Sequence, residues 1–246
     1  MRSLFAALAL CLVASVASAD VVMIEDFEDT TVNYTVSTPD DLSDIANRDY
    51  YGIILPGDGL PADVAYSNLQ GNGFYGVQDT DGATTPVDTI TMDFSVNITN
   101  YENLSFSIFV AEDDANDTNQ DWDTFSSLLV EFQIDGGGFQ NLFAVESELG
   151  TDGNETNEAP REDTDFDQVG DGTEITNVFQ EFTKSIAGTG STLDLRITIT
   201  DLDSGDEDVA IDNVSIEGDF TGIPEPGTMI ILGAIAPLML LRRRKR

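Results

Sequence analysis

A strict two-residue alternation of apolar and polar side chains constrains the fold of this chain more than any other feature. It runs through residues 103–111 and again through residues 192–201. Because side chains two residues apart lie on the same face of a β-strand, each segment predicts a strand with one buried and one solvated face. The predicted inward side chains are Leu104, Phe106, Ile108 and Val110 in the first segment and Leu193, Leu195, Ile197 and Ile199 in the second.

A third segment, residues 126–145, predicts a β-hairpin. Its first half alternates, the glycine-rich residues 135–138 suit a turn, and residues 139–145 form the returning strand. Leu128, Val130, Phe132 and Ile134 are expected to face inward. Shorter apolar segments predict further strands at residues 21–27, 73–78, 89–94, 178–186 and 209–217.

These nine strands, separated by turns rich in Gly, Asn and Asp, indicate an all-β fold. The expected architecture is an antiparallel β-sandwich of the jelly-roll type. The acid-rich residues 112–123 and 150–172 are expected to be long loops. The chain is long enough for one large β-domain, which we expect to span residues 20–220.

The side chains that are missing exclude several classes of chemistry. Histidine is absent and Cys11 is the only cysteine. Cys/His zinc sites, Ser-His-Asp or Cys-His nucleophiles and imidazole proton shuttles are therefore excluded. The formal net charge of -36 argues against nucleic acid as a partner, because an acidic body repels phosphates. The same acidity suits cations or a salty environment.

The first nineteen residues have the layout of a secretory signal peptide. Arg2 supplies the charged start, residues 4–16 are apolar, and the small residues 17–19 suit cleavage. We therefore expect the signal peptide to span residues 1–19 and the mature chain to begin at Asp20.

Residues 228–246 combine an apolar segment with a basic end. The apolar residues 227–241 would form roughly 22 Å of helix, against a hydrocarbon core of about 30 Å. Arg242, Arg243 and Arg244 begin a basic cluster that would remain in the cytoplasm. We expect a marginal transmembrane helix that anchors the body outside the inner membrane. The alternative is a buried core helix with a basic end.

A short linker, residues 221–227, precedes this helix and contains Pro224, Glu225 and Pro226. The triplet, the apolar stretch and the terminal arginines together resemble the PEP-CTERM sorting signal of Gram-negative bacteria, which the membrane protease-transpeptidase exosortase recognises. The resemblance implies export, temporary retention in the inner membrane, cleavage near the triplet, and delivery to the cell surface or an exopolysaccharide matrix. Exosortase and exopolysaccharide are the partners that it implies.

The body of the chain is also similar to a known module. The order of GNGFYGVQDTDG, REDTDFDQVGDGTEIT and EDVAIDNVSI resembles an accessory β-sandwich that accompanies hydrolase, nuclease and lamin-tail domains in secreted bacterial proteins. Because the module is an accessory in those proteins, the resemblance favours binding or structure over catalysis.

Residues 163–174 have the spacing of an EF-hand-type calcium loop. Such loops place oxygen ligands at alternate positions around a cation that takes six to eight of them. Gln168 departs from the pattern, since that position normally holds glycine. The alternative is a solvated acidic loop. The candidate ligands are Asp163, Asp165, Asp167, the carbonyl of Val169, Asp171 and Glu174.

Two further sites are candidates. Sandwich carbohydrate-binding modules often hold a structural calcium between the first and last strands, and this likeness implies a site at Glu25 or Glu28 with Asp212. A glycan site needs an exposed aromatic platform beside polar groups. Trp122, in an acidic loop, is the leading candidate for that platform, and the alternative is a loop aromatic side chain packed over the edge of the core.

Together these features predict a non-catalytic, calcium-stabilised protein of the cell surface or extracellular matrix, acting in cell-envelope or biofilm organisation. The first alternative is a carbohydrate-binding module that uses Trp122. The second is a glycoside hydrolase, which needs only two carboxylates. No strand presents alternate acids of the kind that sandwich glucanases use, so an enzyme is not expected.

Overall fold

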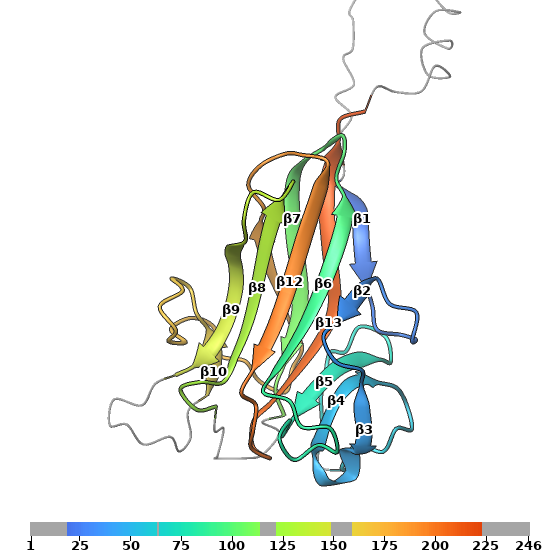
Figure 1. Cartoon of the computed structure of the whole chain (residues 1–246), viewed down its shortest axis with the longest axis vertical. Coiled ribbons are helices and arrows are strands. Elements are labelled where there is room, and N and C mark those ends of the chain that lie inside the picture. Colours follow the sequence, from blue (N-terminus) through green and yellow to red (C-terminus); the bar gives the residue numbers. More distant parts are fainter. Residues whose placement is uncertain (1–18, 63, 114–121, 149–158, 223–246) are drawn as a thin grey trace, which may run out of the picture.

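A computed structural model describes residues 19–62, 64–113, 122–148 and 159–222, which form a sandwich of two antiparallel β-sheets (Figure 1). Almost every regular element of the described residues is a strand, and η1 (Ile45–Asn47) is a single 3₁₀ turn. The long strands of the two sheets run side by side along the length of the molecule. The predicted all-β antiparallel sandwich is therefore confirmed.

The six-stranded sheet has the order β10-β9-β8-β12-β6-β2. Its central strand β12 alternates between buried and half-exposed residues throughout, and β6 and β8 alternate in nearly the same way. One face of this sheet therefore packs inward while the other meets solvent. The strands are β2 (Tyr34–Val36), β6 (Thr89–Asn97), β8 (Ser127–Ile134), β9 (Gln140–Ser147), β10 (Pro160–Glu162) and β12 (Thr192–Thr200).

The seven-stranded sheet has the order β11-β7-β13-β5-β4-β3, and β1 pairs with the C-terminal half of β13. Strand β13 is the longest and pairs with β7, β5 and β1, so it organises this sheet. The strands are β1 (Asp20–Glu25), β3 (Asp41–Asp44), β4 (Asp49–Ile54), β5 (Phe74–Gln78), β7 (Tyr101–Ala111), β11 (Gln180–Ser185) and β13 (Asp208–Phe220).

All nine strands expected from the sequence are present, as β1, β5, β6, β7, β8, β9, β11, β12 and β13. Four strands were not expected. Strands β2, β3 and β10 are three or four residues long and too short to show a period. Strand β4 is six residues long, but five of them are buried, so its sequence DYYGII does not alternate.

The main hydrophobic core lies between the sheets and draws on nearly every long strand. A second cluster covers the outer face of the seven-stranded sheet around β4 and β5. Its aromatic rings come from Tyr50, Phe74 and Phe179, and Tyr66 packs against them. The two sheets thus differ, because the six-stranded sheet leaves its outer face open and the seven-stranded sheet has part of its outer face covered.

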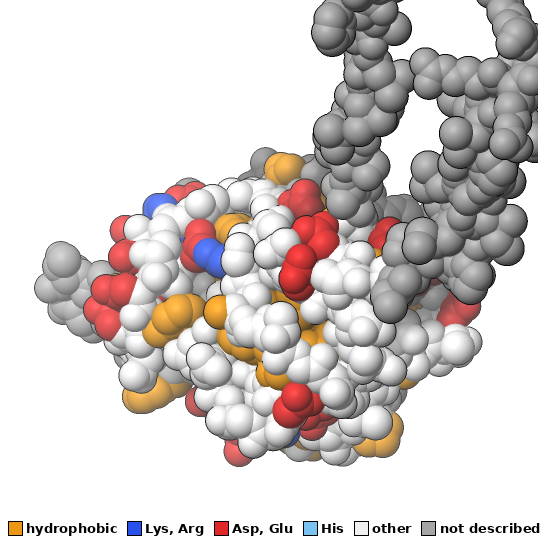
Figure 2. Space-filling model, turned by 90° about the horizontal axis from the view of Figure 1, so that it is seen from above, with side chains coloured by type: hydrophobic (Ala, Val, Ile, Leu, Met, Phe, Trp, Pro, Cys, Tyr) orange, Lys and Arg blue, Asp and Glu red, His pale blue; other side chains and the backbone are white. Residues whose placement is uncertain are grey.

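The two ends of the described domain leave the sandwich together. Asp20, near the first described residue, lies opposite Gly218, near the last, in the β1–β13 pair at one end of the sandwich (Figure 1). Seen from that end, acidic side chains are spread over the surface and basic ones are few (Figure 2).

No helix within the described residues has the length and apolar character needed to cross a bilayer. The expected signal peptide (up to residue 18), Pro224–Glu225–Pro226 and the C-terminal helix lie outside the described residues.

Candidate functional site

A groove of about 530 Å³ lies on the open face of the six-stranded sheet. It crosses β6, β12 and β8, with the turn before β9 and the start of β2 along its sides. Outward positions of the central strands line its floor because the inward positions of these strands fill the core. The side chains that matter most here are Asp93, Ser95, Gln133, Phe139, Asp194 and Arg196.

Arg196 is the centre of one half of the groove. Its Nε donates to Asp93 Oδ1 at 2.8 Å and an Nη donates to Asp93 Oδ2 at 3.3 Å. The guanidinium carbon lies 4.6 Å from the centre of the Phe139 ring. The paired carboxylate raises the pKa of Arg196, so the charge is fixed at any accessible pH. Two fork-like hydrogen bonds and a stacked ring hold this planar group in one orientation.

Asp194 is the centre of the other half. Ser95 Oγ donates to Asp194 Oδ1 at 2.8 Å, and Gln133 Nε2 donates to Asp194 Oδ2 at 3.1 Å. The register explains both contacts, because Ser95 and Gln133 lie opposite Asp194 on the two neighbouring strands. The same pairing places Asp93 opposite Arg196. The result is a row of paired, planar polar groups beside one aromatic ring.

The acidic loop after β10 brings together three of its predicted ligands. Carboxylate oxygens of Asp163, Asp165 and Asp167 lie within 4.8 Å of one another. Asp163 is buried, and its Oδ1 accepts the amide of Phe166 at 2.7 Å while its Oδ2 accepts that of Gln168 at 2.9 Å. The neighbouring Asp167 carboxylate raises the pKa of Asp165, so negative charge is crowded in this group.

The predicted ligands Asp171 and Glu174 are not members of this three-acid group. Asp171 Oδ1 accepts the amide of Thr164 at 3.0 Å, and Glu174 pairs with Arg161. Val169 is half-buried. Gln168 has φ +71°, so the backbone at this position takes the left-handed conformation for which calcium loops use glycine. The loop therefore offers three carboxylates and the expected bend, whereas Asp171 binds Thr164 and Glu174 pairs with Arg161.

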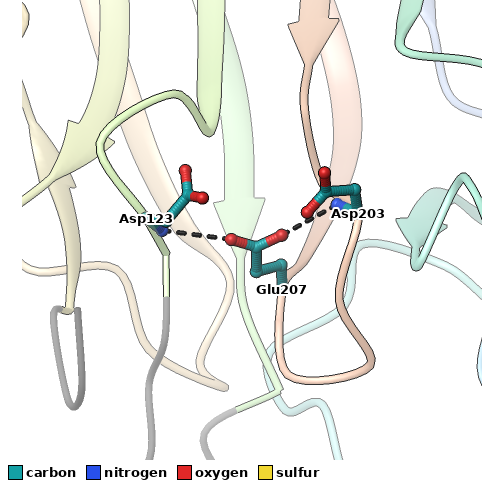
Figure 3. A group of neighbouring side chains, drawn as sticks. All are labelled: Asp123, Asp203 and Glu207. Carbon is teal, nitrogen blue, oxygen red and sulfur yellow. Dashed lines mark hydrogen bonds between the residues drawn. The ribbon is translucent and has the colours of Figure 1, made fainter.

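A second group of three acids, Asp123, Asp203 and Glu207, was not predicted. Figure 3 shows the Glu207 carboxylate between the backbones of Asp123 and Asp203. Glu207 Oε1 accepts the Asp123 amide at 3.1 Å and Oε2 accepts the Asp203 amide at 2.8 Å. Burial raises the pKa of Glu207 to about 7. The three residues come from the loops before β8 and between β12 and β13, so their sequence separation gave no signal.

The expected meeting of the first and last strands is confirmed, since β1 pairs with β13. Glu28 and Asp212 bind the same segment, because Glu28 Oε1 accepts the Asn72 amide at 2.6 Å and Asp212 Oδ2 accepts the Gln70 amide at 3.0 Å. Gly71 between them has φ +108°, and a Cβ there would lie 1.9 Å from Glu28 Oε1.

Neither Glu28 nor Asp212 belongs to a three-acid group among the described residues. Glu25 is also buried, and its Oε2 accepts the Asn33 amide at 2.6 Å. These three carboxylates therefore bind backbone amides, and their role as calcium ligands stays a prediction.

The prediction that Trp122 is an exposed platform is wrong. Its side chain is 0% exposed and belongs to the core between the sheets. Its Nε1 donates to the backbone carbonyl of Asp208 at 3.0 Å. A buried indole needs such an acceptor, and β13 supplies it from a distant part of the chain. Phe139, in the groove, is the aromatic side chain that the sequence did not single out.

No family model matches this chain. No curated protein sequence matches it either. Several solved structures are similar in shape. The CBM22-1 xylan-binding domain of Paenibacillus barcinonensis Xyn10C shares 11% identity with a TM-score of 0.40, covering 85% of this chain and all (100%) of that one. TmCBM61 in complex with β-1,4-galactotriose shares 10% with a TM-score of 0.40, covering 78% and 91%.

A Stig cyclase from Fischerella sp. TAU is similar to the same degree. It shares 14% identity with a TM-score of 0.44, and the match covers 83% of this chain and 100% of the cyclase. Carbohydrate-binding modules and an enzyme thus resemble this sandwich comparably. These likenesses assign no function, which has to be argued from the geometry of the chain itself.

Proposed function

We propose that this protein is a non-catalytic, exported glycan-binding β-sandwich, and that the groove on the open face of the six-stranded sheet is its binding site. The observation that carries the proposal is the row of fixed polar groups across β6, β12 and β8, with Arg196 paired to Asp93 and Asp194 held by Ser95 and Gln133. This row lies beside the Phe139 ring.

The chemistry of a sugar matches that of the groove. Sugar hydroxyls are donors and acceptors at closely spaced positions, and guanidinium, carboxylate and amide groups can bind two of them at once. The ring of Phe139 offers an apolar surface for sugar C–H groups. Because neighbouring side chains already fix these polar groups, little conformational entropy is lost on binding.

The favoured ligand is a neutral polysaccharide. The chain has a formal net charge of -36, which disfavours the approach of a polyanion. An open groove on a sheet also suits a chain that extends past both ends of the site better than a small molecule, which would need deeper enclosure.

Calcium is the cation proposed for the acidic groups. Asp163, Asp165 and Asp167 supply clustered oxygen atoms on a loop with a calcium-loop bend, and hard cations prefer such ligands. Binding there would relieve the repulsion within the group and tie the loop to β10 and β9.

The proposed setting is the cell surface or the extracellular matrix. It rests on the resemblance of residues 222–246 to an exosortase-recognised signal and on the signal-like residues 1–19. Deleting residues 224–246 tests this part separately. Release of the protein, or a change in its surface retention, would support it, and unchanged localisation would contradict it.

Affinity gel electrophoresis tests the binding function. We expect retarded migration in gels that contain at least one of the soluble neutral polysaccharides xylan, β-1,4-galactan and hydroxyethylcellulose. Phe139→Ala should weaken the affinity by about tenfold, the loss of roughly 1.4 kcal/mol that a single central aromatic contact supplies. Phe125→Ala is the matched control, since Phe125 is 70% exposed and lies outside the groove.

The result that opposes the proposal is equally clear. Normal migration in every gel would show that the protein binds none of these polysaccharides. Equal retardation of the Phe139→Ala and Phe125→Ala variants would place any binding outside the groove.

A further inference from the structure

A second hollow, of about 280 Å³, lies where β5 and β7 end and β13 begins. It belongs to the seven-stranded sheet and shares no residue with the groove. Its lining contains no apolar side chain. Besides Gly205, the lining consists of Arg48, Gln78, Glu112, Asp113, Asp206 and Asp208.

The charges of this cavity do not balance. Four carboxylates and one guanidinium leave three formal negative charges in its lining. Arg48 pairs with Asp113, with 3.1 Å between Nη1 and Oδ2. Of these acids Glu112 and Asp208 are buried, at 3% and 2% exposed, whereas Asp206 is exposed. Ionising a buried carboxylate is costly unless a cation compensates its charge, so Glu112 and Asp208 favour a bound cation.

Gln78 points to the same conclusion independently. Its side chain is 1% exposed, and its Nε2 donates to the carbonyl of Gly205 at 2.8 Å. Its Oε1 has no hydrogen-bond partner among the described residues. Because the contact with Gly205 fixes the amide, Oε1 is a buried acceptor available to a ligand in the cavity that Gln78 lines.

The neighbouring carboxylate is held in place for the same ligand. Asp208 lies opposite Gln78 in the β13–β5 pair, so the two side chains share a face. Asp208 Oδ1 accepts the Tyr66 hydroxyl and the Asp113 amide, each at 3.0 Å. These contacts orient the carboxylate while it keeps further acceptor capacity, because an ionised carboxylate has about four acceptor positions.

We propose that this cavity is a binding site for a hard divalent cation, with Gln78 Oε1 as the neutral ligand and the carboxylates of Glu112 and Asp208 as the charged ligands. Carbonyl and carboxylate oxygens are the ligands that calcium takes, whereas magnesium demands a stricter octahedral arrangement. Calcium is therefore the expected ion.

The site is separate from the three-acid group beside it. Glu207 precedes Asp208 in the chain, but its carboxylate binds the amides of Asp123 and Asp203. An ion in the cavity would bind on the seven-stranded sheet, where β13 meets β5 and β7. There it would hold together the strand ends that the second hydrophobic cluster covers from outside.

Terbium luminescence tests the proposal on the purified full chain. Terbium replaces calcium at oxygen sites and emits when a nearby indole is excited. Trp122 is the only tryptophan, and its Nε1 lies 3.0 Å from the carbonyl oxygen of Asp208. We expect tryptophan-sensitised emission that calcium displaces at lower concentration than magnesium.

Variants locate the ion. Glu112→Gln should weaken terbium binding at least about tenfold, and Gln78→Met, which removes the carbonyl while keeping the length, should weaken it severalfold. Asp203→Asn is the matched control, because it changes the neighbouring acidic group and should leave affinity within about twofold. Circular dichroism checks that each variant folds. If one of the two cavity variants does not fold, the other still tests the proposal.

Two results would overturn the proposal. One is wild-type terbium affinity in a folded Glu112→Gln or Gln78→Met variant. The other is emission that only Asp203→Asn abolishes, which would place the ion at Asp123, Asp203 and Glu207. Neither result bears on glycan binding in the groove, which lies on the other sheet.

Discussion

The outer faces of the two sheets differ in how far other side chains cover them. On the six-stranded sheet, β12 alternates buried and half-exposed residues, so Asp194 and Arg196 reach solvent in a groove. On the seven-stranded sheet, all of β5 and nearly all of β4 are buried, because Phe179 and Tyr66 pack over the outer face. The open face can bind a ligand at little structural cost, whereas the covered face holds buried acids and depends on its cover.

The largest expected effect is the loss of that cover. Phe179 is 0% exposed, and its ring lies 5.5 Å from that of Tyr66 and 5.9 Å from that of Phe74. Phe179→Ala should lower the free energy of unfolding by about 3–5 kcal/mol, because it leaves a cavity. Phe139→Ala on the open face should lower it by less than about 1 kcal/mol. Denaturant unfolding measures both, and equal losses would mean that the two faces do not differ in this way.

Calcium should give the next largest effect. At a concentration of one hundred times its Kd a ligand adds about 2.7 kcal/mol, which for a domain of this size raises Tm by roughly 5–10 °C. Excess chelator should reverse the rise. Asp165→Asn, in the loop beside the open sheet, should reduce it, and Asp88→Asn, an exposed acid outside both three-acid groups, should not.

Thermal unfolding at constant ionic strength separates the sites. A rise that Asp165→Asn leaves intact and that Glu112→Gln removes would assign the stabilisation to the cavity of the covered sheet. A Tm that calcium does not change would contradict both metal sites.

The pH dependence of the stability should be a smaller effect, and acids of both sheets contribute to it, because burial also raises the pKa of Glu146 in β9 to about 7. Burial raises the pKa of Asp208 to about 7 and that of Asp212 to about 7, from an ordinary value of 3.8. Below about pH 4 both carboxyls keep their protons in the folded and unfolded states, so their full contribution is present. Between about pH 4 and 7 the unfolded chain ionises first, and stability falls as pH rises.

In chelator, Tm should therefore fall by about 5 °C or more between about pH 5 and pH 8. Asp212→Asn should flatten the slope, because the amide carries no titrating proton. High salt screens repulsion among surface acids but not the effect of burial, so a slope that salt abolishes would attribute the trend to the surface instead.

The contrast between the faces also explains what the sequence could predict. An open face forces alternation, and the strands with alternating residues were all found. Strand β4 was missed because a strand covered on both sides shows no period. Trp122 was assigned to the surface because its neighbours are acids, while its partner, the Asp208 carbonyl, lies 86 residues away.

The groove could not be predicted for a related reason. Alternation places Arg196 and Asp194 on the solvent face, but only the register of β12 against β6 and β8 places Asp93, Ser95 and Gln133 beside them. Register depends on long-range pairing, which one sequence does not reveal. The calcium-type loop was partly predicted, because residues 163–167 are local and their spacing is sufficient to bring the carboxylates together.

The smallest expected effect on stability falls at the centre of the groove. Arg196→Lys keeps the positive charge but loses the two-pronged bond to Asp93 and the planar contact with Phe139. Because Arg196 is partly exposed, the free energy of unfolding should change by less than about 0.5 kcal/mol. Polysaccharide affinity should nevertheless fall severalfold, since a flexible ammonium does not hold Asp93 in place. If Arg196→Lys instead caused a large loss of stability and left the polysaccharide affinity unchanged, the open face would be a structural element rather than a binding surface.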